Sequence, residues 1–190
     1  LARRMDSGEV TLIWLGRPAF VPPPSPILSR WSQIGLCDNQ LCWIEEIGKA
    51  IPYRQASPLS KIEALGIFSQ ILRGVLLLHN HQCVHGDLRE DNIFIQPDGT
   101  PLLVGIGHQS GSVENDLNSL HSLAIYNQAL TAKENLNKLC QPEIPHSLVQ
   151  KLAPQTLPNS EKVISIQLLS HPDTPELALF GEEELTQSRG

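Results

Sequence analysis

The chain has 190 residues, a net charge of −6 and 41% hydrophobic residues, which suits one globular domain or a small two-lobed one. The acidic balance argues against a general nucleic-acid or anionic-membrane binder, which needs clustered Lys and Arg, and the longest apolar run is too short to span a membrane. The sequence has four cysteines: Cys37, Cys42, Cys83 and Cys140. No two of them form a C-x-x-C pair, which predicts free thiols in the cytoplasm and no zinc site.

The first fifty residues predict a strand, a connector and a hairpin. Residues 9–16 (EVTLIWLG) are rich in β-branched and apolar types and follow the turn signal DSG, which indicates a strand. Residues 18–26 contain five prolines, so we expect an extended connector rather than a helix or a central strand. The turn CDNQ lies between two apolar runs and predicts a hairpin over 33–47.

A long helix is the strongest single prediction for the rest of the chain. It runs from Leu59 to about His79, with apolar residues at helical spacing along a broad buried face. Ser60 and Glu63 have the spacing of a capping box, which would fix the start of the helix.

A short hairpin and several further helices are expected after the long helix. Residues 92–107 (NIFIQPDGTPLLVGIG) predict two short strands joined by a turn at Pro-Asp-Gly. Helical patterns follow over 116–132, 145–153 and 160–170.

The stretch CVHGDLREDNIFI at 83–95 holds the pattern H-x-D-L-x-x-x-N. This pattern is specific when a helix precedes it and a strand follows it, as predicted here. Phosphoryl transfer needs a carboxylate that orients the attacking hydroxyl and accepts its proton, and an oxygen ligand for the magnesium that bridges the phosphates. Asp87 is the candidate base and Asn92 the candidate metal ligand, and one short loop carries both.

With this loop and its flanks, the chain resembles the protein kinase family over roughly residues 6–170. The resemblance implies an α+β fold with a reduced small β lobe and a mainly helical large lobe. It implies three parts: the small lobe and hinge over 1–50, the large lobe over 51–172, and a flexible acidic tail over 173–190.

The resemblance also implies roles for individual residues. Arg89 would contact a phosphate, His85 would pack inside the loop, and Asp116 would brace the loop's backbone from the start of a helix. The hinge, which contacts a bound nucleotide in kinases, matches Glu46, Ile47 and Gly48. The neighbouring Glu45 would restrict the adenine pocket, and its side chain is expected to point away from that of Glu46, because adjacent strand residues face opposite sides.

Departures from the family weigh against catalysis. Ile13 stands where kinases have the lysine that holds the nucleotide phosphates, and no lysine occurs before Lys49. Gly105 stands where kinases have the metal-binding Asp of D-F-G. The helix that carries the partner of that lysine is missing, A-P-E does not occur, and Gly86 replaces the Arg of H-R-D.

We therefore expect a pseudokinase, acting as a binding, scaffold or regulatory module with little or no phosphoryl transfer and no cofactor. Asp87 and Asn92 would then bond the loop's own groups. The alternative is an active Ser/Thr-type protein kinase, or a small-molecule kinase like the aminoglycoside phosphotransferases, using ATP and magnesium with atypical metal binding. A third hypothesis is a domain with no role in nucleotide chemistry. Protein partners are expected at the helical lobe or at the Pro-rich segment 18–26, whereas nucleic acid, membrane and zinc are not.

Overall fold

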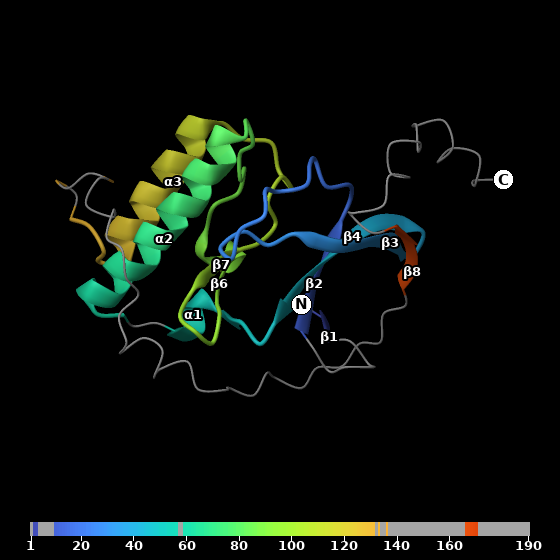
Figure 1. Ribbon diagram of the computed structural model, residues 1–190, viewed down its shortest axis with the longest axis horizontal. Helices are drawn as coiled ribbons and strands as arrows, with labels where there is room; N and C mark the ends of the chain where they lie inside the picture. The colour runs from blue at the N-terminus through green and yellow to red at the C-terminus, as the bar shows by residue number, and fades with distance from the viewer. Residues whose placement is uncertain are drawn as a thin grey trace.

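The computed structural model describes residues 2–3, 10–56, 59–131, 133, 136 and 166–170. The architecture is mixed α/β, with two small antiparallel sheets and a few helices. Figure 1 shows the two long helices side by side at one end, a three-stranded sheet in the middle and a five-stranded sheet at the other end. The helix expected over 145–153 and the tail expected over 173–190 lie outside the described residues.

The five-stranded sheet contains the predicted first strand and the predicted hairpin. Its strands, in spatial order, are β1 (Ala2–Arg3), β2 (Val10–Leu15), β4 (Gln40–Gly48), β3 (Trp31–Cys37) and β8 (Ile166–Ser170). The hairpin of β3 and β4 turns at Asp38 and Asn39, whose φ angles of 51° and 60° suit a two-residue turn with both central residues left-handed. Strand β2 pairs with β4 and places Trp14 opposite Trp43.

The helix expected over 160–170 is wrong for Ile166–Ser170, which form β8. This strand pairs antiparallel with β3, with Leu168 opposite Gly35. A short apolar run does not by itself distinguish a strand from a helix, and here the backbone of β3 supplies the hydrogen-bond partners.

The three-stranded sheet contains β5 (Ile51–Pro52), β6 (Ile93–Ile95) and β7 (Pro101–Leu103). Strands β6 and β7 form the hairpin predicted after the loop, and Gly99 has a φ of 86° in its turn. The connector before β3 lies against this sheet, because Leu103 donates its N–H to the carbonyl of Ile27 at 2.7 Å and accepts from the N–H of Ser29 at 2.8 Å.

The long predicted helix is α2 (Lys61–Asn80), which follows the short helix α1 (Tyr53–Ala56). Its capping box is confirmed, since the N–H of Glu63 donates to Ser60 Oγ at 3.3 Å and the N–H of Ser60 donates to the Glu63 carboxylate at 2.7 Å. Contrary to the sequence expectation, α2 is long and apolar enough to cross a membrane by length and composition. Most of that stretch is buried within the protein, as in the core helix of a globular domain.

Helix α3 (Val113–Tyr126) begins and ends earlier than the predicted 116–132. It begins earlier because Ser112 caps it, accepting the N–H of Asn115 at 3.1 Å. It ends earlier because Gln128, with a φ of 63°, leaves the right-handed helical conformation.

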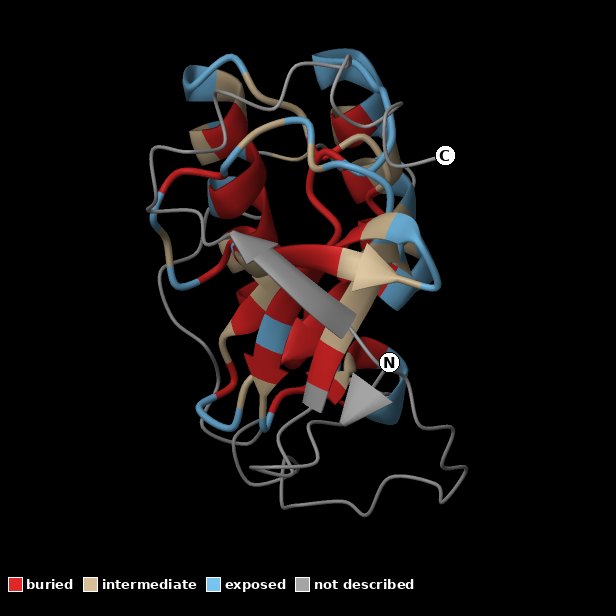
Figure 2. Ribbon diagram, turned by 90° about the vertical axis from the view of Figure 1, so that its right-hand side faces the viewer, coloured by how far each residue is buried: buried red, intermediate tan, exposed pale blue. Residues whose placement is uncertain are grey.

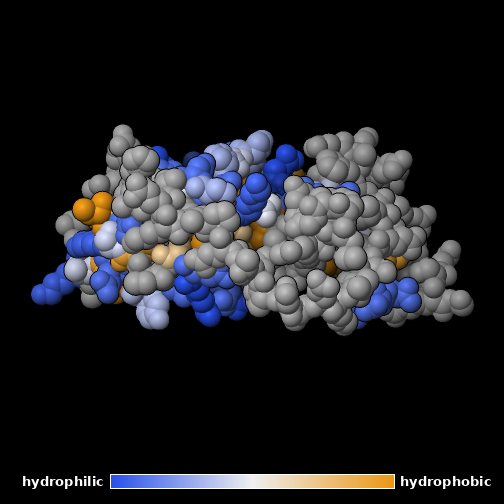
Figure 3. All heavy atoms as spheres, turned by 90° about the horizontal axis from the view of Figure 1, so that it is seen from below, coloured by the Kyte–Doolittle hydropathy of each residue, from blue (hydrophilic) through white to orange (hydrophobic). Residues whose placement is uncertain are grey.

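The main core lies between the helix pair and the three-stranded sheet, where Figure 2 shows buried residues on facing elements. A second group, here called the inter-sheet cluster, joins the two sheets; its members are Ile47, Ala50, Phe94 and Val104, with the partly buried Leu12, Trp14 and Leu102. On the described part of the face in Figure 3, hydrophilic and hydrophobic residues are interspersed.

Candidate functional site

The loop between α2 and β6 brings Asp87 and Asn92 together. The side-chain amide of Asn92 donates to the Asp87 carboxylate at 2.9 Å and to the Asp87 backbone carbonyl at 2.8 Å. Asn92 is buried at the end of a single 3-10 turn, Glu90–Asn92, and its position is therefore set by packing. The loop holds the two side chains as one hydrogen-bonded pair.

Two further donors reach the same Asp87 carboxylate oxygen. A guanidinium nitrogen of Arg89 lies 3.1 Å from it, and the side-chain amide of Gln109 donates to it at 3.4 Å. The Asp87 side chain is 16% exposed and that of Arg89 is 56% exposed, so the ion pair lies at the surface, where such pairs contribute little to stability. The carboxylate is nevertheless surrounded by three donors from this chain.

Asp116 is buried at the first turn of α3 and braces the loop. Its carboxylate accepts the N–H groups of His85 at 2.8 Å and of Gly86 at 3.0 Å. The His79 side chain, from the last turn of α2, lies 3.0 Å from the same carboxylate. Asp116 therefore ties α2, α3 and the loop to one another.

His85 is completely buried, and this burial lowers its pKa to about 4. Its Nδ1 accepts the N–H of Asp87 at 3.3 Å, and its Nε2 has no hydrogen-bond partner within the described part of the chain. The ring is therefore neutral near pH 7 and serves to pack the loop.

Residues 105–112, here called the 105–112 segment, lie directly against the loop. The N–H of Gly107 donates to the carbonyl of His85 at 3.1 Å. A Cβ on Gly111 would lie 2.7 Å from the Cα of Gly86, and a Cβ on Gly86 would collide with the backbone of Gln109. Neither glycine has room for a side chain, so the close approach depends on both.

A buried carboxylate also contacts the 105–112 segment. Glu45, on the central strand β4, is fully buried, and its carboxylate accepts the N–H of Gly105 at 3.0 Å and the indole N–H of Trp14 at 2.8 Å. The Ser29 hydroxyl is a third partner. Burial raises the pKa of Glu45 to about 7, although these hydrogen bonds oppose the rise. Glu46 is exposed, as strand alternation predicts.

Trp14 fills the space beside Gly105. A Cβ on Gly105 would lie 2.6 Å from Cη2 of Trp14. The Trp14 ring stacks on Trp43 at a centroid distance of 5.7 Å, and His108 lies against it at 4.9 Å. Leu12 and Trp14 both contact the inter-sheet cluster, so alternation along β2 turns Ile13 toward the opposite face of the sheet.

The three hinge residues differ in exposure. Ile47 is buried in the inter-sheet cluster, Glu46 is exposed, and Gly48 has a φ of 57°. A pocket of ≈ 490 Å³ lies beside them, and Arg30 and Leu102 are among its lining residues. The hinge thus borders a solvent-accessible pocket as well as the packed cluster.

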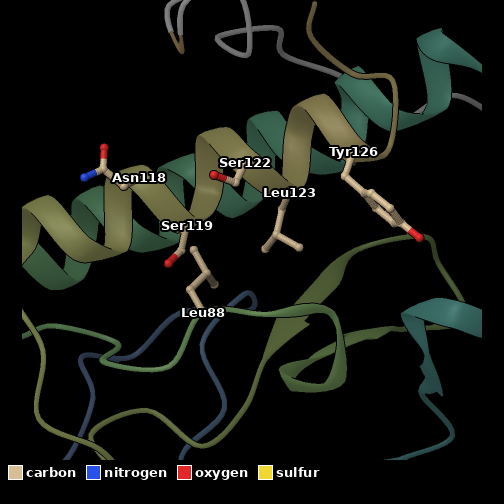
Figure 4. Close-up of a pocket in the computed structure, with 6 residues that line it drawn as sticks. All are labelled: Leu88, Asn118, Ser119, Ser122, Leu123 and Tyr126. Atoms are coloured by element: carbon tan, nitrogen blue, oxygen red, sulfur yellow. The ribbon is translucent and has the colours of Figure 1, made fainter. Parts of the chain in front are cut away.

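A second pocket, of ≈ 420 Å³, lies between α3 and the loop. Figure 4 shows Leu123 and Ser119 pointing from α3 toward Leu88, which follows Asp87, whereas Asn118 points away. Its walls are a mixture of hydroxyl and apolar groups without a charged side chain. Among the residues that line it there is no carboxylate, histidine or cysteine.

The residues brought together do not fit a divalent metal. Among the described residues, no three His, Cys, Asp or Glu side chains lie close enough to hold one. Asp87 and Asn92 supply oxygens, but Gly105 adds none, and the Glu45 carboxylate beside it is already engaged by N–H donors. Asp87 supplies the one carboxylate that the described contacts place beside Asn92, and its Oδ2 already lies within reach of three donors of this chain.

Sequence reasoning missed the contact between Glu45 and Gly105 and the approach of Gln109 to Asp87. These pairs are 60 and 22 residues apart, and no local pattern connects them. One signal was available for the first: Glu45 follows the apolar run LCWI in a strand, where a buried carboxylate needs donors from elsewhere.

Comparison with known proteins finds sequence similarity to protein kinases over a short stretch of the chain. No protein-family model matches the chain. A stretch of 54 residues is 39% identical to Serine/threonine-protein kinase HAL5 of Saccharomyces cerevisiae (strain YJM789) and 37% identical to Sperm motility kinases 3A and 2B of Mus musculus. It covers 28% of this chain, 6% of the first protein and 11% of each of the others.

Part of the chain is thus similar in sequence to protein kinases, and the mixed α/β architecture is compatible with part of a kinase-like fold. The matched stretch spans about a tenth or less of the length of these curated relatives.

Proposed function

We propose that the chain is a kinase-like domain without phosphoryl-transfer activity, a pseudokinase that acts as a binding, scaffold or regulatory module. The observation that carries this proposal is the position of Trp14 beside Gly105. Both residues donate an N–H to the buried carboxylate of Glu45, which holds them in place. In the kinase interpretation, Gly105 replaces the metal-binding aspartate, and the residue of β2 that faces it is Trp14 rather than Ile13. An indole then stands where a phosphate-binding cation is needed.

The packing between the two sheets supports the same proposal. Leu12 and Trp14 from β2 pack in the inter-sheet cluster with Leu102 from β7, next to the hinge residue Ile47. An adenine placed between the two sheets would have to separate these side chains, because the pocket of ≈ 490 Å³ beside the hinge lies at the edge of the cluster. We therefore propose that neither ATP nor magnesium is a cofactor.

The donors around Asp87 support it as well. A catalytic base must accept a proton from a substrate hydroxyl, and a positioned base alone contributes about 10²–10⁴-fold. Here Asn92, Arg89 and Gln109 all reach one Asp87 oxygen, which suits a structural role.

One observation favours the alternative of an active enzyme, a protein kinase or an aminoglycoside-phosphotransferase-like small-molecule kinase. Asp87 and Asn92 lie within 2.9 Å of each other, and Asp87 retains 16% exposure. Such an enzyme would need both a cation and a metal-binding carboxylate beyond the groups described here.

The partner of such a module is proposed to be a protein that contacts the helical part of the chain. The Pro-rich segment is a weaker candidate, because Pro22 and Pro23 are buried while Pro24 and Pro26 are exposed. A groove that reads a P-x-x-P motif needs both prolines accessible, and Pro23 is not.

A thermal-shift titration with Mg-ATP tests the proposal. A ligand at 100 times its Kd stabilises a protein by about 2.7 kcal/mol, which gives a readily measured rise in Tm. We expect no saturable rise with Mg-ATP, and the same result with ATP and EDTA. A saturable rise that depends on magnesium would contradict the proposed loss of the nucleotide site.

A further inference from the structure

Three elements contact one buried carboxylate, that of Glu45. Glu45 Oε2 accepts the indole N–H of Trp14 at 2.8 Å, from β2, and the backbone N–H of Gly105 at 3.0 Å, from the 105–112 segment. The Ser29 hydroxyl adds a partner from the connector. The 105–112 segment is therefore hydrogen-bonded to the five-stranded sheet through a group that can gain or lose a proton.

We propose that Glu45 is a proton-sensitive latch, which holds the 105–112 segment and Trp14 closed against the sheet when neutral and favours their local opening when ionised. In the closed form the carboxyl group is completely removed from water, and a charge there is costly. In the open form the carboxylate is hydrated. Ionisation therefore favours the form in which water reaches it.

The direction of the pH dependence follows from linkage. Burial raises the pKa of Glu45 in the closed form to about 7, whereas its ordinary value is 4.5. The open form therefore loses its proton first as the pH rises. Between pH 4.5 and 7, each increase of one pH unit raises the equilibrium constant for opening about tenfold. This constant therefore rises by about 300-fold over the range and stays constant above it.

Other ionisable groups on the surrounding elements are few among the described residues. Strand β2 (Val10–Leu15) carries none. The others are Arg17 and Arg30 on the connector, His108 on the segment, Cys37 on β3, Cys42 and Glu46 on β4, and His85, Asp87 and Arg89 on the loop that packs against the segment. Arg17, Arg30, Glu46 and His108 are exposed. His108 contacts the Trp14 ring, so a His108→Gln variant is a necessary control.

The proposal is independent of the proposed function, because it depends only on the contacts of Glu45. It holds whether the domain binds a nucleotide, a protein or neither. Opening would expose Trp14, which is partly buried, and the backbone of the 105–112 segment.

Hydrogen exchange of the Gly105 amide tests the latch directly, because this N–H donates to Glu45. Exchange is measured between pH 4.5 and 7, and each rate is divided by the intrinsic rate at that pH. We expect protection to fall by up to about 300-fold in the wild type, Glu46→Gln and His108→Gln, and to stay constant in Glu45→Gln. The amides of Ile71 and Val75, in the core of α2, should remain more protected throughout. Constant protection of Gly105 in the wild type, or protection equal to that of α2 at every pH, would overturn the proposal.

A second measurement needs no variant at position 45. The NMR signal of the Trp14 indole N–H reports the protonation of its acceptor in the wild-type chain. We expect its chemical shift to titrate with a midpoint near pH 7. A midpoint near pH 4.5, or no titration, would refute the latch.

Discussion

The side chain of Asn92 donates to both the carboxylate and the backbone carbonyl of Asp87, at 2.9 and 2.8 Å. This pair closes the loop between α2 and β6 on itself. The two residues that suggest a catalytic loop in the sequence therefore have a structural role that needs no metal and no substrate.

Replacing Asn92 with Ala should destabilise the metal-free protein by about 2 kcal/mol, because the carbonyl and the carboxylate of Asp87 lose a donor whose side chain is buried. Chemical denaturation in EDTA measures this loss. Asn118→Ala, at an exposed position of α3, is the control and should change the stability by less than about 0.5 kcal/mol. If Asn92 served only as a metal ligand, its replacement would leave the metal-free stability unchanged.

Replacing Asp116 with Ala should cost about 3 kcal/mol. The N–H groups of His85 and Gly86 would lose their acceptor in a buried site, and His79 would lose its partner. Denaturation curves report the loss, and exchange of the His85 and Gly86 amides should become faster. Unchanged exchange at these two amides would show that Asp116 does not brace the loop.

Replacing Gly105 with Ala should cost about 2–4 kcal/mol, because its φ is 71° and the new Cβ would lie 2.6 Å from Trp14. Gly48→Ala is a matched control, with a φ of 57° and nothing within 4 Å of the new Cβ, and should cost about 1 kcal/mol. Adding Trp14→Leu to Gly105→Ala should recover part of the loss. Strictly additive effects would argue against direct contact between the two residues.

The pH dependence of stability should contain two opposing contributions. His85 has its pKa lowered from 6.5 to about 4, so its contribution is present above pH 6.5 and is lost as the pH falls toward 4. Glu45 has its pKa raised from 4.5 to about 7, so its contribution is present below pH 4.5 and is lost as the pH rises toward 7. Each amounts to about 3 kcal/mol at most, and they largely cancel between pH 4.5 and 6.5.

Removing one of the two groups should reveal the other. Urea denaturation of Glu45→Gln should show stability that rises between pH 4 and 6.5, with the slope due to His85. Glu46→Gln should keep the flatter wild-type profile, because Glu46 is exposed. Identical profiles for the two variants would show that Glu45 does not titrate as its burial requires.

Local signals in the sequence were sufficient for much of the fold. Ser60 and Glu63 mark the start of α2, and the Pro-Asp-Gly turn fixes the hairpin of β6 and β7, because each depends on residues only a few positions apart. The limits of α3 were missed because Ser112 was not recognised as its cap. Strand β8 was missed because its partner, β3, is about 130 residues away in the sequence.

The candidate site could be predicted only in part from the sequence. The loop pattern indicated Asp87 and Asn92, which the fold brings into contact. The groups that decide their environment come from elsewhere in the chain: Gln109 reaches Asp87, and Glu45 reaches Gly105, through tertiary packing. To predict which side chain of a strand faces a given site, the register of the strand must be known exactly. A shift of one residue would make Ile13 rather than Trp14 the side chain that faces Gly105.

The most direct test of the central claim is a phosphoryl-transfer assay with radiolabelled Mg-ATP, comparing the wild type with Asp87→Ala. Transfer is measured to the protein itself, to a general protein substrate and to water. We predict that the wild type shows no transfer above the level of Asp87→Ala. Transfer by the wild type that Asp87→Ala abolishes would contradict the proposal and establish an active kinase.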